Sequence, residues 1–141
     1  MSTDLAKLQR LQRLERIRAI AKQSALMQAA EAESTLAQLL TLAERTDTLA
    51  VSYSGGLHLV NGHDLRVREQ FVAGLNGISR AAHRDAAQAR TQADQRQQEL
   101  AASERSRVAA KDRAEACERK LAQSRQVPMI DARRPIGTDL E

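Results

Sequence analysis

Apolar and small residues in the second half of the chain repeat with the seven-residue period of a coiled coil. With Leu65 as position a of the heptad, the a positions are Leu65, Val72, Ser79, Ala86, Ala93, Leu100, Arg107, Ala114 and Leu121. The d positions are Arg68, Leu75, Ala82, Ala89, Arg96, Ser103, Ala110, Cys117 and Ser124. Small residues at most of these positions allow two helices to approach closely while burying little apolar area per residue. The pattern predicts a helix over about 64–125 that packs along a narrow seam.

The first half of the chain has no Gly or Pro between residues 4 and 50, which predicts a second long helix over about 4–50. Its later part carries a heptad seam of Leu36, Leu39, Ala43, Thr46 and Ala50. Its earlier part repeats every three residues, at Leu5, Leu8, Leu11, Leu14, Ile17 and Ile20. Because a helix has about 3.6 residues per turn, this spacing drifts around the helix. One partner helix therefore cannot cover every apolar group.

Turn-forming residues separate the two predicted helices over about 51–63, namely Ser52, Ser54, Gly55, Gly56, Asn61 and Gly62. Asp64 is the expected N-cap of the second helix. Val127-Pro128 is expected to end it, because proline disfavours helix at the preceding residue. We predict an all-α, long antiparallel two-helix coiled-coil hairpin over 1–125, followed by a flexible C-terminal tail over 126–141.

The amino-acid composition further restricts the class of protein. The chain has one Phe, one Tyr and no Trp among 141 residues, which disfavours a bulky globular core. A single cysteine, Cys117, cannot form an intramolecular disulfide, which is typical of a cytosolic protein. We expect neither a signal peptide nor a transmembrane helix, because no long continuous apolar stretch occurs.

The positive charge is concentrated in two segments that a hairpin brings to its open end. Residues 1–25 carry six basic and two acidic side chains, and residues 100–125 carry seven basic and four acidic. These segments together have a formal charge of +7, whereas residues 26–99 have a charge of −2. Such a basic end can steer the protein towards an acidic cavity, a nucleic acid or an anionic membrane.

We expect no catalytic residues, no cofactor and no metal site. The spacing of His58, His63 and His83 is not that of metal ligands, and Cys117 falls at a d position typical of a small core residue. Gly55-Gly56 lacks the Lys-Ser/Thr of a phosphate loop. Nucleic acid and direct membrane insertion are not expected partners, because the basic segments lack stacking or interfacial aromatic residues.

One apolar cluster follows the predicted loop. Phe71, Leu75 and Ile78 recur at i, i+4 and i+7, with Leu75 at a d position and the other two beside the seam. The cluster either packs onto Leu42, Leu49 or the loop, or forms an exposed docking strip for a partner.

The arrangement of these features resembles the FliJ family, the small stalk proteins of the flagellar type III export apparatus. The resemblance covers residues 4–125 and includes a helix of about 50 residues, a Gly-rich connection and a longer second helix. That second helix opens with the stretch Gln70-Phe71-Val72-Ala73-Gly74-Leu75-Asn76-Gly77-Ile78.

The resemblance implies a non-enzymatic antiparallel coiled coil similar to the rotor stalk of rotary ATPases. Its open end would enter the hexameric export ATPase and promote assembly and activity. We expect Arg10, Arg13, Arg113 and Arg119 to contact that ring. Phe71, Leu75 and Ile78 match the family's apolar patch for the membrane export gate. Export chaperones are further expected partners, and the expected location is the cytoplasmic face of the inner membrane at the flagellar base.

Two other functions stay open on the residues alone. The chain can be a generic coiled-coil adaptor or structural rod, in which a homo-oligomer buries the drifting apolar face of the first helix. A less favoured alternative is a basic helical hairpin that binds nucleic acid, whose binding would fall steeply with salt.

Overall fold

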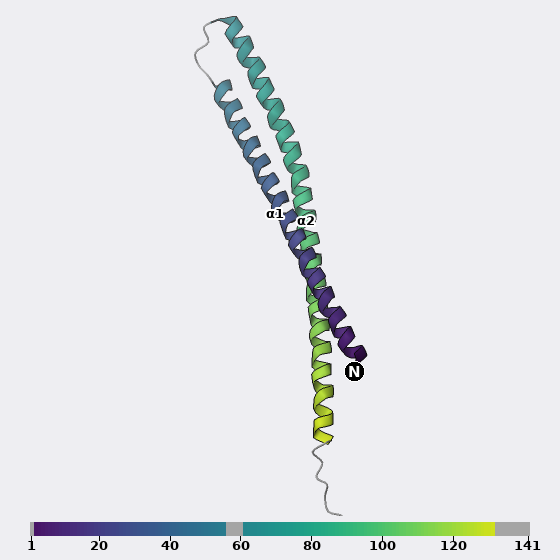
Figure 1. Ribbon diagram of the computed structural model, residues 1–141. Helices are drawn as coiled ribbons and strands as arrows, with labels where there is room; N and C mark the ends of the chain where they lie inside the picture. The colour runs from purple at the N-terminus through teal and green to yellow at the C-terminus, as the bar shows by residue number, and fades with distance from the viewer. Residues whose placement is uncertain (1, 56–60, 132–141) are drawn as a thin grey trace, which may run out of the picture. The chain divides into compact units, whose positions relative to one another are not determined.

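The protein consists of two long helices packed against each other. The computed structural model describes residues 2–55 and 61–131, with the backbone alone for residues 127–131. Helix α1 spans Ser2–Ser54 and helix α2 spans Gly62–Asp131, and the described residues include no strand (Figure 1). The predicted all-α hairpin of two long helices is therefore confirmed.

The helix boundaries lie outside those predicted. Helix α1 continues without interruption four residues beyond Ala50, and α2 begins two residues before Asp64. The predicted stop before Pro128 is wrong, because α2 continues to Asp131 and makes residues 126–131 helical. Proline lacks a backbone donor and crowds the carbonyl four residues earlier, but that carbonyl belongs to the exposed Ser124 close to the end of the helix, where water can bond to it. Residues 132–141, the rest of the predicted tail, lie outside the described residues.

The N-cap of α2 is Asn61 rather than the predicted Asp64. The Asn61 side-chain oxygen accepts a hydrogen bond from the backbone N–H of Asp64 at 2.9 Å. Asparagine at this position satisfies one of the free donors of the first turn. Asp64 lies within that turn, where a negative charge is favourable to the helix dipole.

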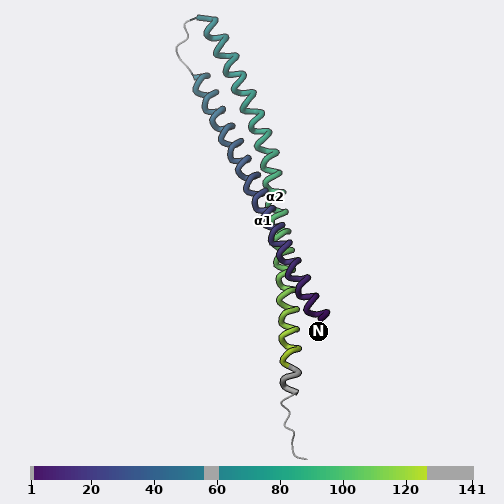
Figure 2. The backbone as a smooth tube through the Cα atoms, in the orientation of Figure 1, coloured from purple at the N-terminus to yellow at the C-terminus, as the bar shows by residue number. Residues whose placement is uncertain are grey.

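The chain divides into two compact units, which are described separately. The central unit comprises residues 25–100, and the terminal unit comprises residues 1–24 together with residues 101–141. In the central unit α1 and α2 lie side by side (Figure 2). Gln28 contacts Arg96, Asp47 contacts Ser79, and Tyr53 contacts Phe71. Partner numbers fall along α2 as they rise along α1, so the two segments are antiparallel.

The interior of each unit consists almost entirely of small side chains at the predicted heptad positions. Over residues 62–126 of α2, the buried residues all occupy a or d positions: Leu75, Ser79, Ala82, Ala86, Ala89, Ala93, Ala110, Ala114 and Leu121. The buried residues of α1 are Ala29, Ala43, Thr46 and Ala50. Alanine in the seam brings the backbones close but buries little area. Thr46 remains satisfied because its hydroxyl donates to the Leu42 carbonyl at 2.7 Å.

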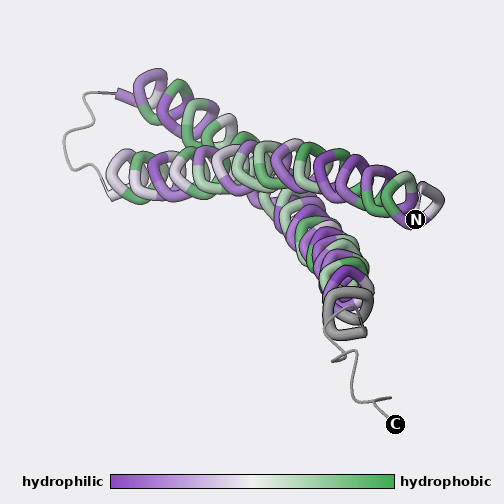
Figure 3. The backbone as a smooth tube through the Cα atoms, turned by 60° about the horizontal axis from the view of Figure 1, so that its bottom comes forward, coloured by the Kyte–Doolittle hydropathy of each residue, from purple (hydrophilic) through white to green (hydrophobic). Residues whose placement is uncertain are grey.

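The narrow seam leaves many large apolar side chains on the surface. Hydrophobic and hydrophilic residues alternate along both helices (Figure 3). Ile17 and Ile20, in the drifting part of α1, are 61% and 70% exposed. The expectation that one partner helix cannot cover every apolar group of α1 is therefore confirmed.

Candidate protein-interaction surfaces

The terminal unit brings together the four arginines expected to contact the ATPase ring. Arg10 and Arg13 come from α1, Arg113 and Arg119 come from α2, and all four are exposed. Within the described part of the chain, none of them forms an ion pair. Their charge is therefore available to an external partner.

Two other cations of the terminal unit, Lys22 and Arg107, share the carboxylate of Glu104, whose single negative charge offsets one of their two positive charges. The Arg107 guanidinium donates two hydrogen bonds to the two Glu104 oxygens, at 2.9 and 2.7 Å. Lys22 reaches the same carboxylate from α1 at 2.8 Å. The Arg107 and Lys22 bonds lower the pKa of Glu104 from 4.5 to about 2, and Glu104 in turn raises the pKa of Arg107. Glu104 thus links α1 to α2, a role that helical spacing within one segment does not reveal.

The residues of the predicted gate patch do not share one surface. Leu75 is 8% exposed and belongs to the seam, whereas Phe71 and Ile78 are 48% and 52% exposed. The Phe71 ring packs edge-on against Tyr53, with a centroid separation of 4.9 Å and an interplanar angle of 74°. Phe71 therefore has a partner at the end of α1 and still offers about half of its surface.

Heptad position places four half-exposed apolar residues of the central unit on one side of the seam. Phe71 and Ile78 precede the a residues Val72 and Ser79, so they occupy g positions of α2. Leu42 and Leu49 precede the seam residues Ala43 and Ala50 and occupy g positions of α1. In an antiparallel helix pair the g positions of the two helices flank the same side of the seam. We call these four residues, Leu42, Leu49, Phe71 and Ile78, the apolar strip; all are 47–52% exposed.

A polar cluster occupies the other side of the central unit. Asp47 and His83 stand at e positions, and the His83 Nε2 atom lies 2.9 Å from an Asp47 oxygen. The buried Ser79 hydroxyl donates to the other Asp47 oxygen. The hydrogen bonds from Ser79 and then from His83 lower the pKa of Asp47. The cluster links α1 to α2 beside a polar core position and so favours one register.

The histidines and the cysteine, the other candidates for a metal or reactive site, are not gathered into one. His63 is exposed, His58 lies outside the described residues, and Cys117 is partly exposed at its d position. Over residues 2–55 and 61–131, no group of three or more His, Cys, Asp or Glu side chains is arranged to hold a metal ion.

No helix in the described part of the chain is long and apolar enough to cross a membrane.

Comparison with protein-family models, with curated proteins and with solved structures gives no match to this chain.

The Glu104 contacts predict a pH dependence of stability. The folded pKa of about 2 lies below the unfolded value near 4.5, so the contribution is complete above pH 4.5 and is lost as pH falls towards 2. Thermal unfolding of the Glu104→Gln variant should therefore show a lower Tm than the parent at pH 7, with the difference closing towards pH 2. Glu33→Gln, at an exposed position of α1, controls for the change in net charge. A constant difference between parent and Glu104→Gln across this range would contradict the assignment.

Proposed function

We propose that this chain is a non-enzymatic stalk component of the flagellar type III protein export apparatus. Its terminal unit enters the central cavity of the hexameric export ATPase and promotes hexamer assembly and ATP hydrolysis. The observation that carries the proposal is the set of four exposed arginines, contributed by both helices of the terminal unit, that form no ion pair with any residue the structure describes. A cluster of one sign attracts an oppositely charged surface and speeds association.

In this proposal, the central unit makes the second contact with the export apparatus. The apolar strip of Leu42, Leu49, Phe71 and Ile78 docks onto the export gate at the cytoplasmic face of the inner membrane. An aromatic side chain beside three aliphatic ones is suitable for a hydrophobic hot spot. Leu75 stabilises the seam beneath the strip and does not contact the gate directly. The same stalk escorts empty export chaperones, which is the part of the proposal with no residues assigned.

A coiled-coil adaptor that forms a homo-oligomer is the second candidate function. The exposure of Ile17 and Ile20 favours it, because a second copy can bury them. Analytical ultracentrifugation over a range of concentrations tests this candidate. A dimer that dissociates in the Ile17→Ser, Ile20→Ser variant supports the adaptor, and a monomer throughout the micromolar range contradicts it.

Charge reversal tests the ATPase contact. Replacement of Arg10, Arg13, Arg113 and Arg119 by Glu should lower stimulation of the purified export ATPase from the same source by about tenfold or more at low ionic strength. The matched control reverses four exposed arginines of the central unit, Arg45, Arg66, Arg84 and Arg90, and so changes net charge equally. Hexamer formation is measured in parallel. Equal stimulation by both variants, or none by the parent chain, would contradict the proposal.

The gate contact is tested by removing exposed apolar groups. The Phe71→Ala, Ile78→Ala variant should bind the cytoplasmic domain of the gate protein at least about tenfold more weakly, because truncation of hot-spot residues commonly costs more than 1 kcal/mol each. Its stimulation of the ATPase should be unchanged. Leu75→Ala is the control for stability, and its loss of a buried side chain should lower the free energy of unfolding by about 2 kcal/mol or more. Unaltered gate binding by the double variant would remove the strip from the proposal.

A further inference from the structure

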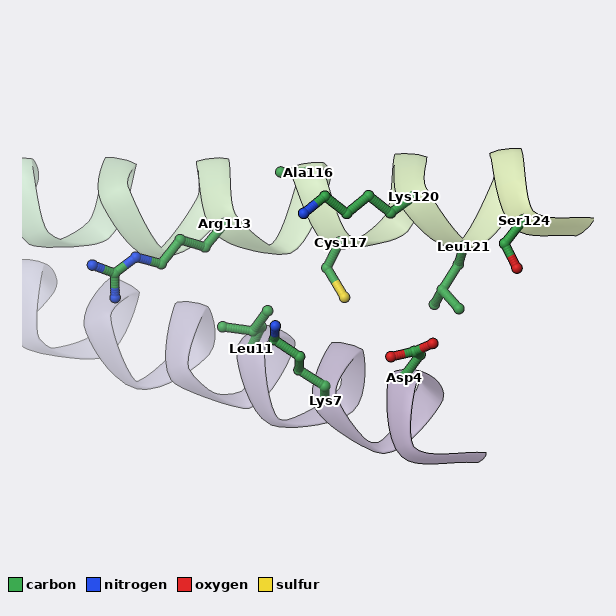
Figure 4. A pocket seen from close by; sticks show the side chains of 9 residues that line it. All are labelled: Asp4, Lys7, Leu11, Arg113, Ala116, Cys117, Lys120, Leu121 and Ser124. Atoms are coloured by element: carbon green, nitrogen blue, oxygen red, sulfur yellow. The ribbon is translucent and has the colours of Figure 1, made fainter. Parts of the chain in front are cut away.

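The terminal unit contains a groove between the start of α1 and the last turns of α2. Its volume is about 320 Å³. The side chains of Leu11, Cys117 and Leu121 meet between the two helices and form its apolar floor (Figure 4). Such a floor is suitable for one or two aliphatic side chains of a ligand.

The rim of this groove is predominantly cationic. Lys7 from α1 and Arg113 and Lys120 from α2 border it, together with one acidic residue, Asp4 (Figure 4). None of these four side chains makes an ion pair with another residue that the structure describes. Three unpaired cations around an apolar floor favour a segment that combines aliphatic with acidic side chains.

We propose that residues 136–141 of this chain occupy the groove and cover its cationic rim. The segment reads Ile136-Gly137-Thr138-Asp139-Leu140-Glu141. Ile136 and Leu140 match the floor, while Asp139 and Glu141 match the three cations. The occupied groove is an autoinhibitory contact, because an external acidic partner must displace the segment to reach Arg113.

The length of the chain beyond α2 is sufficient for this return. The described helix ends at Asp131, which lies seven residues past Ser124, the last residue to line the groove. Seven helical residues span roughly 10 Å, and the eighteen from Arg113 span roughly 27 Å. The ten residues 132–141 can extend over roughly 33 Å. Pro135 and Gly137 are turn-forming residues at the start of the segment.

Cys117 reports directly on this contact, because it lines the groove and is the only cysteine of the chain. The measurement is the rate of its reaction with N-ethylmaleimide, an uncharged reagent that the rim does not attract. Rates are compared at the plateau of each pH profile, so that a change in thiolate fraction does not contribute. A chain ending at Asp131 should react about fivefold faster or more, which corresponds to a groove occupied about four-fifths of the time in the full chain.

Charge variants at full length separate docking from fraying of the helix end. Asp139→Asn with Glu141→Gln should react nearly as fast as the shortened chain, whereas Arg133→Gln with Arg134→Gln should keep the slow rate of the parent. Salt should accelerate the parent and leave the shortened chain unchanged. Circular dichroism verifies that helix content is equal throughout.

Three results would overturn the proposal. Equal rates for the full and shortened chains would mean that the groove is open, and it would then be available to an acidic segment of another protein. A fast shortened chain with a slow Asp139→Asn, Glu141→Gln variant would assign the effect to the helix end. A rate that falls with protein concentration would place the segment in the groove of a second copy. All of these assays use the isolated chain, so their outcome is independent of ATPase stimulation.

Discussion

The alanine seam is the constraint on which the rest of the structure depends. Ala82, Ala86, Ala89 and Ala93 bring α2 close to α1, and no large described side chain becomes fully buried. A seam with a width of one small residue stabilises each unit by close contact over a long length. The same narrowness leaves no interior for the leucines and isoleucines outside the a and d positions. The exposed apolar surface of this protein is a direct consequence of its core.

Around Asp47 and Ser79, the two sides of the central seam differ in chemistry. Asp47, Ser79 and His83 form a hydrogen-bonded cluster across the e positions, whereas the apolar strip follows the g positions. An alanine seam by itself tolerates a shift of one helix along the other, because neighbouring heptads are alike. A polar cluster that is satisfied in one register disfavours the others. The polar side thus fixes the register in which the apolar strip is assembled.

Some cations of the terminal unit form an ion pair within the protein, and others face solvent. Lys22 and Arg107 share Glu104, and the Lys22 ion pair joins α1 to α2. Arg10, Arg13, Arg113 and Arg119 have no such acidic partner in the described chain and face solvent. The net charge of the segments therefore does not equal the charge that a partner encounters. Glu104 offsets one of the two positive charges that it contacts, and Arg113 also borders the groove.

The sequence by itself determined the helical class, the hairpin and the heptad register of α2, because each follows from local periodicity. The heptad also placed Leu75 in the seam and Phe71 and Ile78 beside it, but it left open whether those two side chains are covered or exposed. Only the tertiary structure decided which residues of α1 contact α2: Tyr53 packs on Phe71, and Lys22 meets Glu104. Those pairings depend on how far α1 is shifted along α2, and the two helix patterns alone leave that shift open. The Asn61 cap and the helical residues beyond Pro128 were not predicted either. Each depends on a small difference in free energy between one hydrogen bond within the protein and hydration of the same groups.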